Sequence, residues 1–370
     1  MSTTAAIPRP TADLTVVAGA TAALGAVAAI LAHDGAWRAV ALLLVAAGLG
    51  ASFLATGFSY TGAFRNWMMR GDGSGLAAGV GVAIVAAIVI IPVAAFVPGY
   101  SGYSAPLGLP LIGGAMLFGA GMQWANGCGS GTLFTAGGGS RRMWVTLPCF
   151  CAGGLLGSLL LPTAFMLPAL PEIVLPQILG PWLGLAATLS LAGGLVWLVL
   201  GRGPRPDAKR LRAAGLIGAL AALAFLLSGQ PWGITSGLTL WGAKAAAALG
   251  LDIAHTTFWS WDGPKQFLAG SVLAQDSSLM DIGMLLGAAI AAGRAGSFNN
   301  QPMPPLRGFL GAAIGGILMG IGARLSFGCN VGAMVGGIAS GSLHGFVWFF
   351  AVMPGCWVGI KLRPWFGFAA

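Results

Sequence analysis

The chain has 370 residues, of which 57% are hydrophobic and only 7% are charged. An ordinary soluble domain has about 25% charged residues, so this composition excludes a surface that is mostly exposed to water. The 18 basic and 9 acidic residues give a net charge of +9. Because the basic residues stand between apolar stretches, they indicate membrane topology and contacts with anionic lipids, and no nucleic-acid partner is expected.

Ten apolar stretches are long enough to cross a bilayer, which takes roughly 17–25 residues. In chain order they are 14–31, 37–55, 75–97, 109–125, 143–167, 181–200, 211–228, 279–295, 306–326 and 344–361. The first is not expected to be a cleavable signal peptide, because its start is rich in proline and further spans follow it closely. The sequence therefore predicts an all-α polytopic membrane protein.

A hydrophilic basic stretch divides the chain near its middle. We expect an N-terminal segment with an extra transmembrane helix at 1–36, a first membrane repeat at 37–200, a basic linker at 201–212 and a second membrane repeat at 213–370. Loops rich in lysine and arginine stay in the cytoplasm. Counting spans from the linker then places both termini in the cytoplasm, in a multi-pass protein of the bacterial inner membrane.

Two apolar stretches are broken by glycines. They read GCGSGT at 127–132 and GCNVG at 328–332, and they align at an offset of 201 together with a preceding Gly-x-Gly. Irregular backbone at membrane depth requires protein or a water-filled cavity around it, and inverted repeats with broken helices are common in secondary transporters. We therefore predict an hourglass of two inverted repeats whose re-entrant half-helices place Cys128 and Cys329 face to face near the midplane.

This pair of cysteines favours a path for a small anion. Buried thiols keep their protons and act as soft, weak hydrogen-bond donors, while half-helix N-termini supply positive charge. The candidate path residues beside Cys128 and Cys329 are Gly127, Gly129, Ser130, Gly328 and Asn330. The glycines allow close approach of the backbone, whereas Asn330 has the alternative interpretation of a brace for the loop.

Arg324 and Gln123 occupy equivalent places before the two breaks. Arg324 is expensive in a span and is either an interfacial residue or a cation that draws anions towards Cys329; Gln123 could donate in the same way. Cys149, Cys151 and Cys356 lie in ordinary spans and are interpreted as packing residues. No cofactor, catalytic residue or metal site is expected, because nucleotide-binding and hydrolase motifs are missing and the three histidines lack ligand partners.

Four motifs resemble the YeeE/YedE family of sulfur transporters. They are GCGSGTL at 127–133, PWGITSG at 231–237, GCNVGA at 328–333 and GIASGSLHGFVW at 337–348, and the likeness covers roughly residues 40–367. The resemblance implies thiosulfate uptake and an hourglass fold of inverted repeats. It also implies that Cys128 and Cys329 relay the anion by S–H hydrogen bonds.

The chain departs from this family at Ser59. Members often have a further cysteine here, whereas FSYTGAFRN at 58–66 has a serine, which donates a hydrogen bond but is less polarisable. Sulfite, another sulfur oxyanion or a selenium compound thus stay open as substrates behind thiosulfate. A thiol-redox protein that uses Cys128 and Cys329, and a passive channel, are the competing classes. The coupling ion and a cytoplasmic sulfur-carrier partner are also left open.

Overall fold

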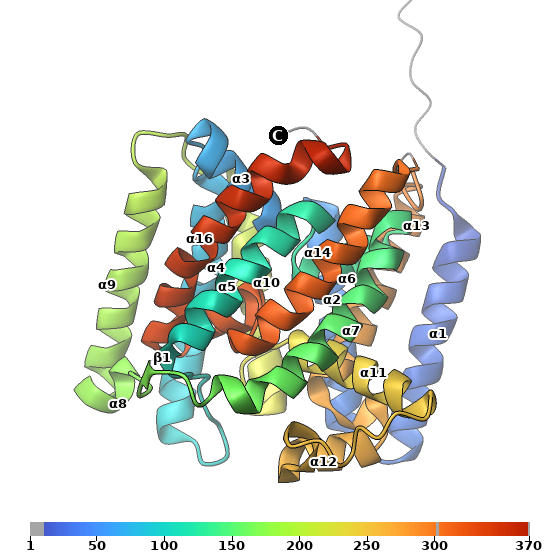
Figure 1. The fold of residues 1–370 in the computed structure, drawn as a ribbon, viewed down its shortest axis with the longest axis horizontal. Coiled ribbons are helices and arrows are strands. Elements are labelled where there is room, and N and C mark those ends of the chain that lie inside the picture. The colour runs from blue at the N-terminus through green and yellow to red at the C-terminus, as the bar shows by residue number, and fades with distance from the viewer. Residues whose placement is uncertain (1–10, 301–302, 369–370) are drawn as a thin grey trace, which may run out of the picture.

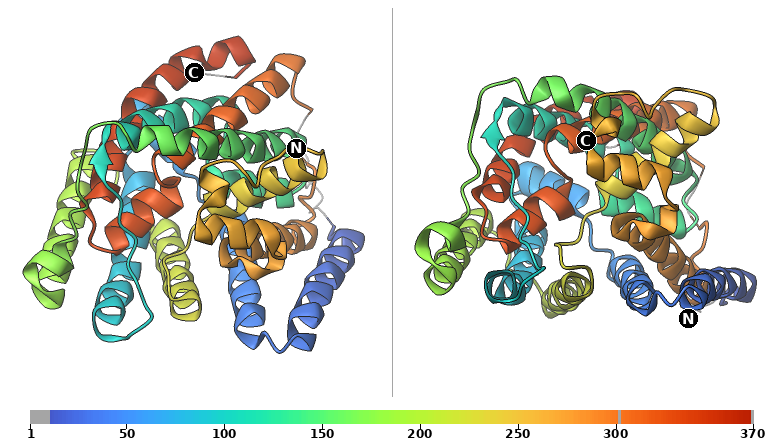
Figure 2. Two further views of the ribbon diagram at one scale, coloured as in Figure 1. Left: turned by 60° about the horizontal axis from the view of Figure 1, so that its bottom comes forward. Right: turned by 90° about the horizontal axis from the view of Figure 1, so that it is seen from below.

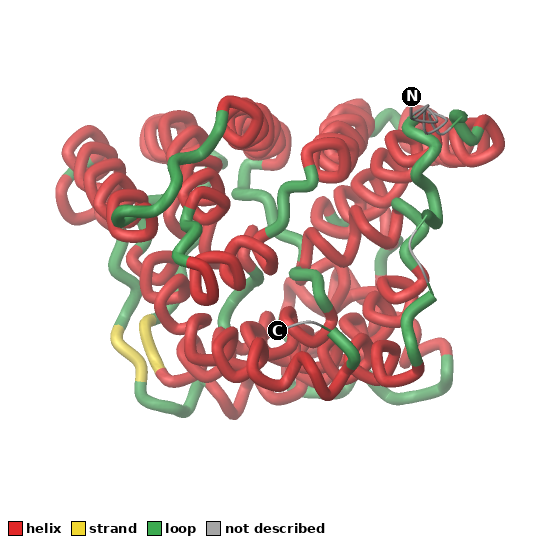
Figure 3. The backbone as a smooth tube through the Cα atoms, turned by 90° about the horizontal axis from the view of Figure 1, so that it is seen from above, coloured by secondary structure: helices red, strands yellow, loops and turns green. Residues whose placement is uncertain are grey.

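A computed structural model describes residues 11–300 and 303–368. Residues 1–10 of the predicted N-terminal segment, and 301–302 and 369–370 of the predicted second repeat, lie outside these ranges. Within them nearly all of the regular secondary structure is helical, and the two short strands pair with each other at one edge of the molecule (Figure 3). The all-α fold predicted from composition is confirmed.

The first half begins with a helix at one edge of the molecule and continues with long helices separated by short ones. Its elements are α1 (Leu14–His33), α2 (Trp37–Thr56), α3 (Tyr60–Arg70), α4 (Ser74–Phe96), β1 (Leu107–Gly108), α5 (Leu109–Ala125), α6 (Gly129–Gly137), α7 (Arg141–Ala164), β2 (Ala169–Leu170), α8 (Leu175–Leu179) and α9 (Pro181–Leu200). β1 and β2 are antiparallel and pair Leu107 with Leu170.

The second half repeats this order of long and short helices. Its elements are α10 (Ala208–Ser228), α11 (Thr235–Ala248), the 3₁₀ turns Phe258–Ser260 and Val272–Ala274, α12 (Asp262–Ala269), α13 (Asp276–Arg294), α14 (Leu306–Leu325), a π-helix (Asn330–Gly336), α15 (Gly337–Ala339), α16 (Leu343–Leu362) and the 3₁₀ turn Arg363–Phe366. The π-helix continues directly into α15, so the two together form one short helix after the second broken stretch.

All ten stretches predicted to span the membrane are helices, and no predicted end differs from the observed one by more than three residues. Within the described residues, nine helical stretches are long and apolar enough to cross a bilayer. α5 has 17 residues, which is at the lower limit for a span. α3, α8, α11 and α12 were not predicted, because they are short or carry several polar residues.

The long helices form two rows. One row runs α9–α4–α10–α2–α13–α1 and the other runs α16–α5–α14–α7, with neighbours in each row packed against each other. In the right view of Figure 2, the helices of the first row lie along the bottom and are seen roughly down their axes. α3, α6, α11 and the π-helix with α15 fill the space between the rows. The core of the protein, and the two broken stretches with it, therefore lies between two helical layers.

The most extensive packing contacts between the two halves have counterparts in which the corresponding helices of the other half take part. α7 packs on α14 as α16 packs on α5, and α2 packs on α13 as α10 packs on α4. α5 and α14 cross each other through glycines: a β-carbon on Gly121 would lie 2.6 Å from the carbonyl oxygen of Gly315, and one on Gly114 would lie 2.7 Å from that of Gly322. Since Gly114 meets the later glycine and Gly121 the earlier one, these helices are antiparallel. This arrangement supports the predicted inverted repeat.

The basic linker identifies one end of the molecule. The segment between α9 and α10, the start of α1 and the end of α16 all lie at the upper end in Figure 1, whereas α8, α12 and the loop after α4 lie at the lower end. This grouping is the one that the count of spans predicts. The assignment of the upper end to the cytoplasm stays a prediction.

Reporter fusions test this orientation. A cytoplasmic reporter inserted in 202–206 or fused after Ala370 should be active, and a periplasmic reporter in the loop 249–256 should be active too. The physical reason is the retention of lysine- and arginine-rich loops in the cytoplasm. Periplasmic activity at 202–206 would contradict the orientation and would reverse the direction of the path described below.

Candidate substrate path

The two broken stretches have the same backbone geometry. Asn126 and Phe327, which stand 201 positions apart, both adopt left-handed conformations with φ of 58° and 60°. A bulky residue such as Phe327 rarely adopts this conformation, and such strain concentrates at functional sites. After each break a cysteine forms the N-cap of the next short helix, with φ, ψ of −90°, −168° at Cys128 and −100°, −167° at Cys329.

Hydrogen bonds from neighbouring helices hold each break in place. Asn126 Oδ1 accepts from Nη1 of Arg65 and of Arg363, each at 3.1 Å. The carbonyl of Phe327 accepts the Tyr103 hydroxyl. The Asn126 side chain thus braces the first break. At both breaks, side chains from other elements supply the hydrogen bonds that hold the chain in place.

The two short helices meet at their cysteine ends. Cys128 and Cys329 are 1% and 0% exposed, and a β-carbon on Gly129 would lie only 2.9 Å from Cys329 Sγ. Cys128 Sγ lies 3.4 Å from Ser130 Oγ. Among the described residues, no side-chain hydrogen bond from the N-cap position is found at either short helix, although backbone N–H groups of Val331 and Gly332 approach the Cys329 thiol. The two thiols and the first N–H groups of the short helices therefore come together at one place.

A buried amide without partners adjoins the thiols. Asn330 follows Cys329 and is fully buried, yet neither its Oδ1 nor its Nδ2 has a hydrogen-bond partner among the described residues. Leaving a buried polar group unsatisfied costs about 1–3 kcal/mol. The brace interpretation of Asn330 is therefore not supported by any contact of its side chain, and the amide is free to bind a polar ligand.

A cavity of about 590 Å³ opens from the lower end of the molecule and reaches the second broken stretch. We call it the vestibule. Its lining includes Trp232, Arg324 and Gly328. The Arg324 guanidinium lies 4.4 Å from the centre of the Phe258 ring, and its Nε has no hydrogen-bond partner among the described residues. Arg324 thus lies in the cavity wall, as the anion-drawing interpretation requires.

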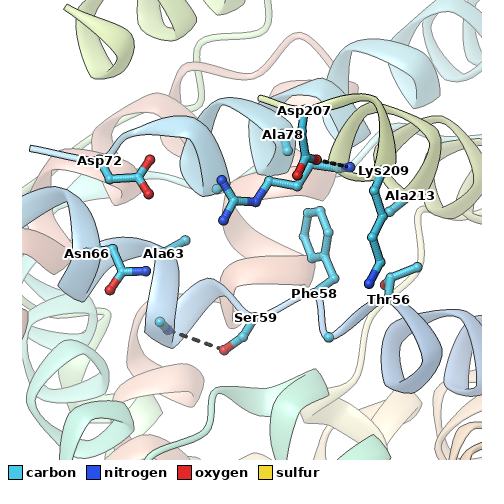
Figure 4. A pocket seen from close by; sticks show the side chains of 14 residues that line it. Thr56, Phe58, Ser59, Ala63, Asn66, Asp72, Ala78, Asp207, Lys209 and Ala213 are labelled. Atoms are coloured by element: carbon cyan, nitrogen blue, oxygen red, sulfur yellow. Dashed lines mark hydrogen bonds between the residues drawn. The ribbon is translucent and has the colours of Figure 1, made fainter. Parts of the chain in front are cut away.

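A second cavity, of about 310 Å³, lies beside the basic linker. We call it the basin; Phe58, Ser59, Lys209 and Arg210 line it, and Figure 4 shows Lys209 extending towards Thr56. Ser59 caps α3 by accepting the N–H of Gly62 at 3.3 Å and is exposed to the cavity.

The basin also contains acidic groups that limit its positive charge. The Ser74 hydroxyl donates to the Asp72 carboxylate, and this bond, helped by Arg210, holds the pKa of Asp72 below its ordinary value. Asp207 Oδ1 accepts the backbone N–H of Arg210 at 2.7 Å. Both carboxylates are therefore bound to neighbouring groups, and the cationic side chains can still attract an anion at short range.

An aromatic cluster separates the two cavities. The ring of Phe53 lies 5.8 Å from that of Phe58 in the basin wall and 6.0 Å from that of Trp232 in the vestibule wall. Phe134 of α6 stacks on Phe53 at 5.5 Å. The ring of Tyr60 lies 5.4 Å from that of Phe58, and its hydroxyl donates to the carbonyl of Gly79 at 3.4 Å. The rings of Phe53, Phe58 and Trp232 therefore lie between the walls of the basin and the vestibule.

Most of the site residues predicted from the sequence lie near the thiols or in the cavity walls, but one does not. Gly129 and Ser130 lie against the two thiols, Gly328 lies in the vestibule wall and Gly127 lies at the first break. Gln123 differs: its Nε2 donates to the carbonyl of Thr61 at 3.2 Å, and it thereby joins α5 to α3. Trp232 and Tyr60 were missed, although Trp232 belongs to the motif at 231–237.

Comparison with known proteins agrees with these features. A family model described as sulphur transport matches residues 55–358. The probable transporter YedE of Escherichia coli K12 is 34% identical over 168 residues, and that of Salmonella typhimurium is 33% identical; each match covers 45% of this chain and 39% of the relative. The thiosulfate transporter TsuA of Spirochaeta thermophila is 28% identical over 280 residues, covering 68% of this chain and 78% of that protein. The chain thus spans less than half the length of the two YedE relatives.

Proposed function

The chain belongs to the YeeE/YedE sulphur-transport family of membrane proteins, and on this premise we propose that it carries thiosulfate inward through the two cavities. One observation carries the proposal: two short helices, each with a cysteine at its N-cap position, meet between the vestibule and the basin. The similarity to a protein named thiosulfate transporter supports this choice of substrate. We also propose the bacterial inner membrane as its location.

In the proposed path the anion first enters the vestibule. Arg324 attracts the negative charge there, and Trp232 offers an apolar and polarisable wall. A buried guanidinium interacts strongly with an anion because the surrounding dielectric is low. Arg324 packs on the Phe258 ring near Gly328, so the anion is drawn to that wall. Arg38, the other cation of the lining, is paired with Asp276 and does not hold the anion as a second cation.

The anion then passes the two thiols. Cys329 donates its S–H first and Cys128 second, while the Asn330 amide and the first N–H groups of the short helices meet the remaining oxygen atoms. These donors are neutral, so they bind a dianion weakly enough for it to leave. The thiols act as a relay without changing oxidation state, and Cys128 passes the anion towards Ser59 and the basin.

The test is uptake of ³⁵S-labelled thiosulfate in bacterial cells that lack other importers. Expression of the full chain should restore uptake, and an excess of unlabelled sulfite or selenite shows whether the path prefers these anions. Inhibition by sulfite far below that by thiosulfate supports the proposed substrate. Absence of thiosulfate uptake, with the protein present in the membrane, would refute it. Release to a cytoplasmic sulfur-carrier protein is a further proposal, which co-purification of such a protein would test.

Ser59 provides a graded test of the end of the path. Ser59→Ala removes the hydroxyl that faces the basin and should slow uptake about fivefold, on the scale of about 1 kcal/mol for one hydrogen bond. Ser59→Cys restores a donor and should retain or exceed the activity of the unchanged chain.

The helix cap at Ser59 requires a control. Loss of an N-cap costs about 1 kcal/mol of stability, so the thermal stability of all three proteins must be measured in detergent. Equal uptake by all three, at matched expression, would mean that Ser59 only caps α3 and that the relay has two stations.

A further inference from the structure

A carboxyl group without a partner lies inside the second half of the membrane domain. Asp281 of α13 is 0% exposed, and neither of its side-chain oxygens has a hydrogen-bond partner among the described residues. An isolated ionised carboxylate in an apolar interior is so costly that the group takes up a proton instead. In these surroundings Asp281 therefore holds a proton. Ionisable residues inside membrane helices commonly mark ion pathways and proton relays.

Asp281 lies one helical turn deeper than the vestibule wall. Ser277, four residues earlier on α13, lines the vestibule and accepts the Ser236 hydroxyl at 2.8 Å; residues four apart lie on the same helix face. On the facing helix α11, a β-carbon on Gly237 would lie 2.4 Å from Asp281 Oδ2. The glycine thus makes the room that the carboxyl group occupies, and there is little space for a metal cation with its own ligands.

No charged side chain among the described residues of the helices packed against α13 pairs with Asp281, so no fixed charge holds it in the ionised form. The thiols of Cys329 and Cys151 are near enough for an ionised Asp281 to act on them, but neither makes a hydrogen bond to it. Of the elements packed on α13, α2 carries Arg38, which pairs with a carboxylate at the vestibule rim, and α11 carries Lys244, which donates to two backbone carbonyls. α6 and the turn before α13 have no titratable side chain, and that of α1 is exposed at the end of its helix.

We propose that Asp281 is the proton-binding site that couples anion movement to the proton gradient. This inference rests on the proposed function and deepens it. A dianion moving into a cell with a negative interior works against the membrane potential. One proton carried with it lowers the net inward charge from −2 to −1 and so halves this electrical work. Asp281 binds a proton from vestibule water while the anion is at Cys329, and it releases the proton to water on the basin side. Only an O–H bond forms and breaks, and nothing is oxidised or reduced.

The test uses the purified full chain in proteoliposomes that contain a pH-sensitive dye. Addition of thiosulfate outside should acidify the interior, and an inward proton gradient should increase uptake. Asp281→Asn preserves the shape of the side chain but cannot bind and release a proton. In this variant, thiosulfate-driven acidification should be at least tenfold slower, and the proton gradient should no longer stimulate uptake. Exchange of labelled for unlabelled thiosulfate should persist, because exchange needs no net proton movement. Asp34→Asn, on an exposed turn, is the matched control and should behave as the unchanged chain.

The outcomes separate the coupling from the function itself. Undiminished acidification in Asp281→Asn, transport without proton movement in the unchanged chain, or dependence on a sodium gradient would overturn the coupling role. Absence of both exchange and net uptake in the unchanged chain would refute thiosulfate transport instead. If Asp281→Asn shows no exchange, Asp281→Glu decides: a shifted pH dependence of uptake supports the proposal, and an unaltered one overturns it.

Discussion

Replacing Cys128 or Cys329 by alanine is expected to almost abolish thiosulfate uptake. In the proposed path each change removes one S–H donor between the vestibule and the basin and leaves part of the anion unsatisfied there. The expected cost is about 1–3 kcal/mol at the barrier, which corresponds to a roughly ten- to hundredfold lower rate. Initial rates of labelled thiosulfate uptake, normalised to the amount of protein in the membrane, give the measurement.

Serine and a distant cysteine supply the controls. Cys128→Ser and Cys329→Ser keep a donor but lose the polarisable sulfur, so they should fall between the unchanged chain and the alanine variants. Cys149 lies in α7, next to α14 in the same row, and is half-buried outside the proposed path. Cys149→Ala should therefore retain nearly full uptake. Robust uptake by both alanine variants of the central pair would contradict the relay.

The same variants distinguish the relay from a thiol-redox protein. In the relay both thiols stay reduced, so a membrane-permeant reductant should not alter uptake by the unchanged chain. A redox protein would form a Cys128–Cys329 disulfide during turnover, and non-reducing mass spectrometry of peptides would detect it. Accumulation of that disulfide with thiosulfate turnover would favour the redox mechanism.

The spans and the two breaks could be predicted because each has a local physical cause. An apolar stretch of sufficient length has to be a helix in a bilayer, and a glycine-rich interruption at a repeated Gly-Cys interrupts that helix. α3 was not predicted because it has 11 residues, among them Arg65, Asn66 and Arg70. Its position between the helical rows comes from tertiary contacts, which no local pattern contains.

The site was predicted at its centre and incompletely around it. Cys128 and Cys329 could be proposed because the repeat marks them, and Gly129 because it adjoins Cys128. The aromatic cluster, in contrast, depends on rings from α2, α6 and the motif at 231–237 that meet only in the fold. Asp281 had a usable signal, since an acidic residue within a predicted span is unfavourable. Its lack of partners could be seen only once its neighbours were placed.

Gly129→Ala is expected to slow thiosulfate uptake tenfold or more while the protein still folds. The added methyl group would lie 2.9 Å from Cys329 Sγ and 3.2 Å from its Cβ, closer than such atoms pack. Either the thiol rotates away from the path or the two short helices separate, and in both cases the donors no longer face the anion together. Misplacement of this kind by about 1 Å commonly costs a hundredfold in rate.

A matched glycine separates this effect from the general effect of alanine in a helix. Gly113→Ala, on α5, adds its methyl group where no atom lies within 4 Å, so uptake and thermal stability should be unchanged or slightly improved. Full uptake by Gly129→Ala, with expression equal to that of Gly113→Ala, would show that the contact between Gly129 and Cys329 is not part of the path.

A double variant tests whether the loss comes from this contact. Oxygen is smaller than sulfur and has a shorter bond to the β-carbon, so Cys329→Ser relieves part of the crowding that Gly129→Ala creates. Cys329→Ser should therefore cost less in the Gly129→Ala background than in the unchanged chain, a deviation from additivity that residues in direct contact show. Strict additivity of the two losses would mean that Gly129→Ala acts elsewhere, through the backbone of α6. The coupling thus locates the meeting point of the two short helices by function alone.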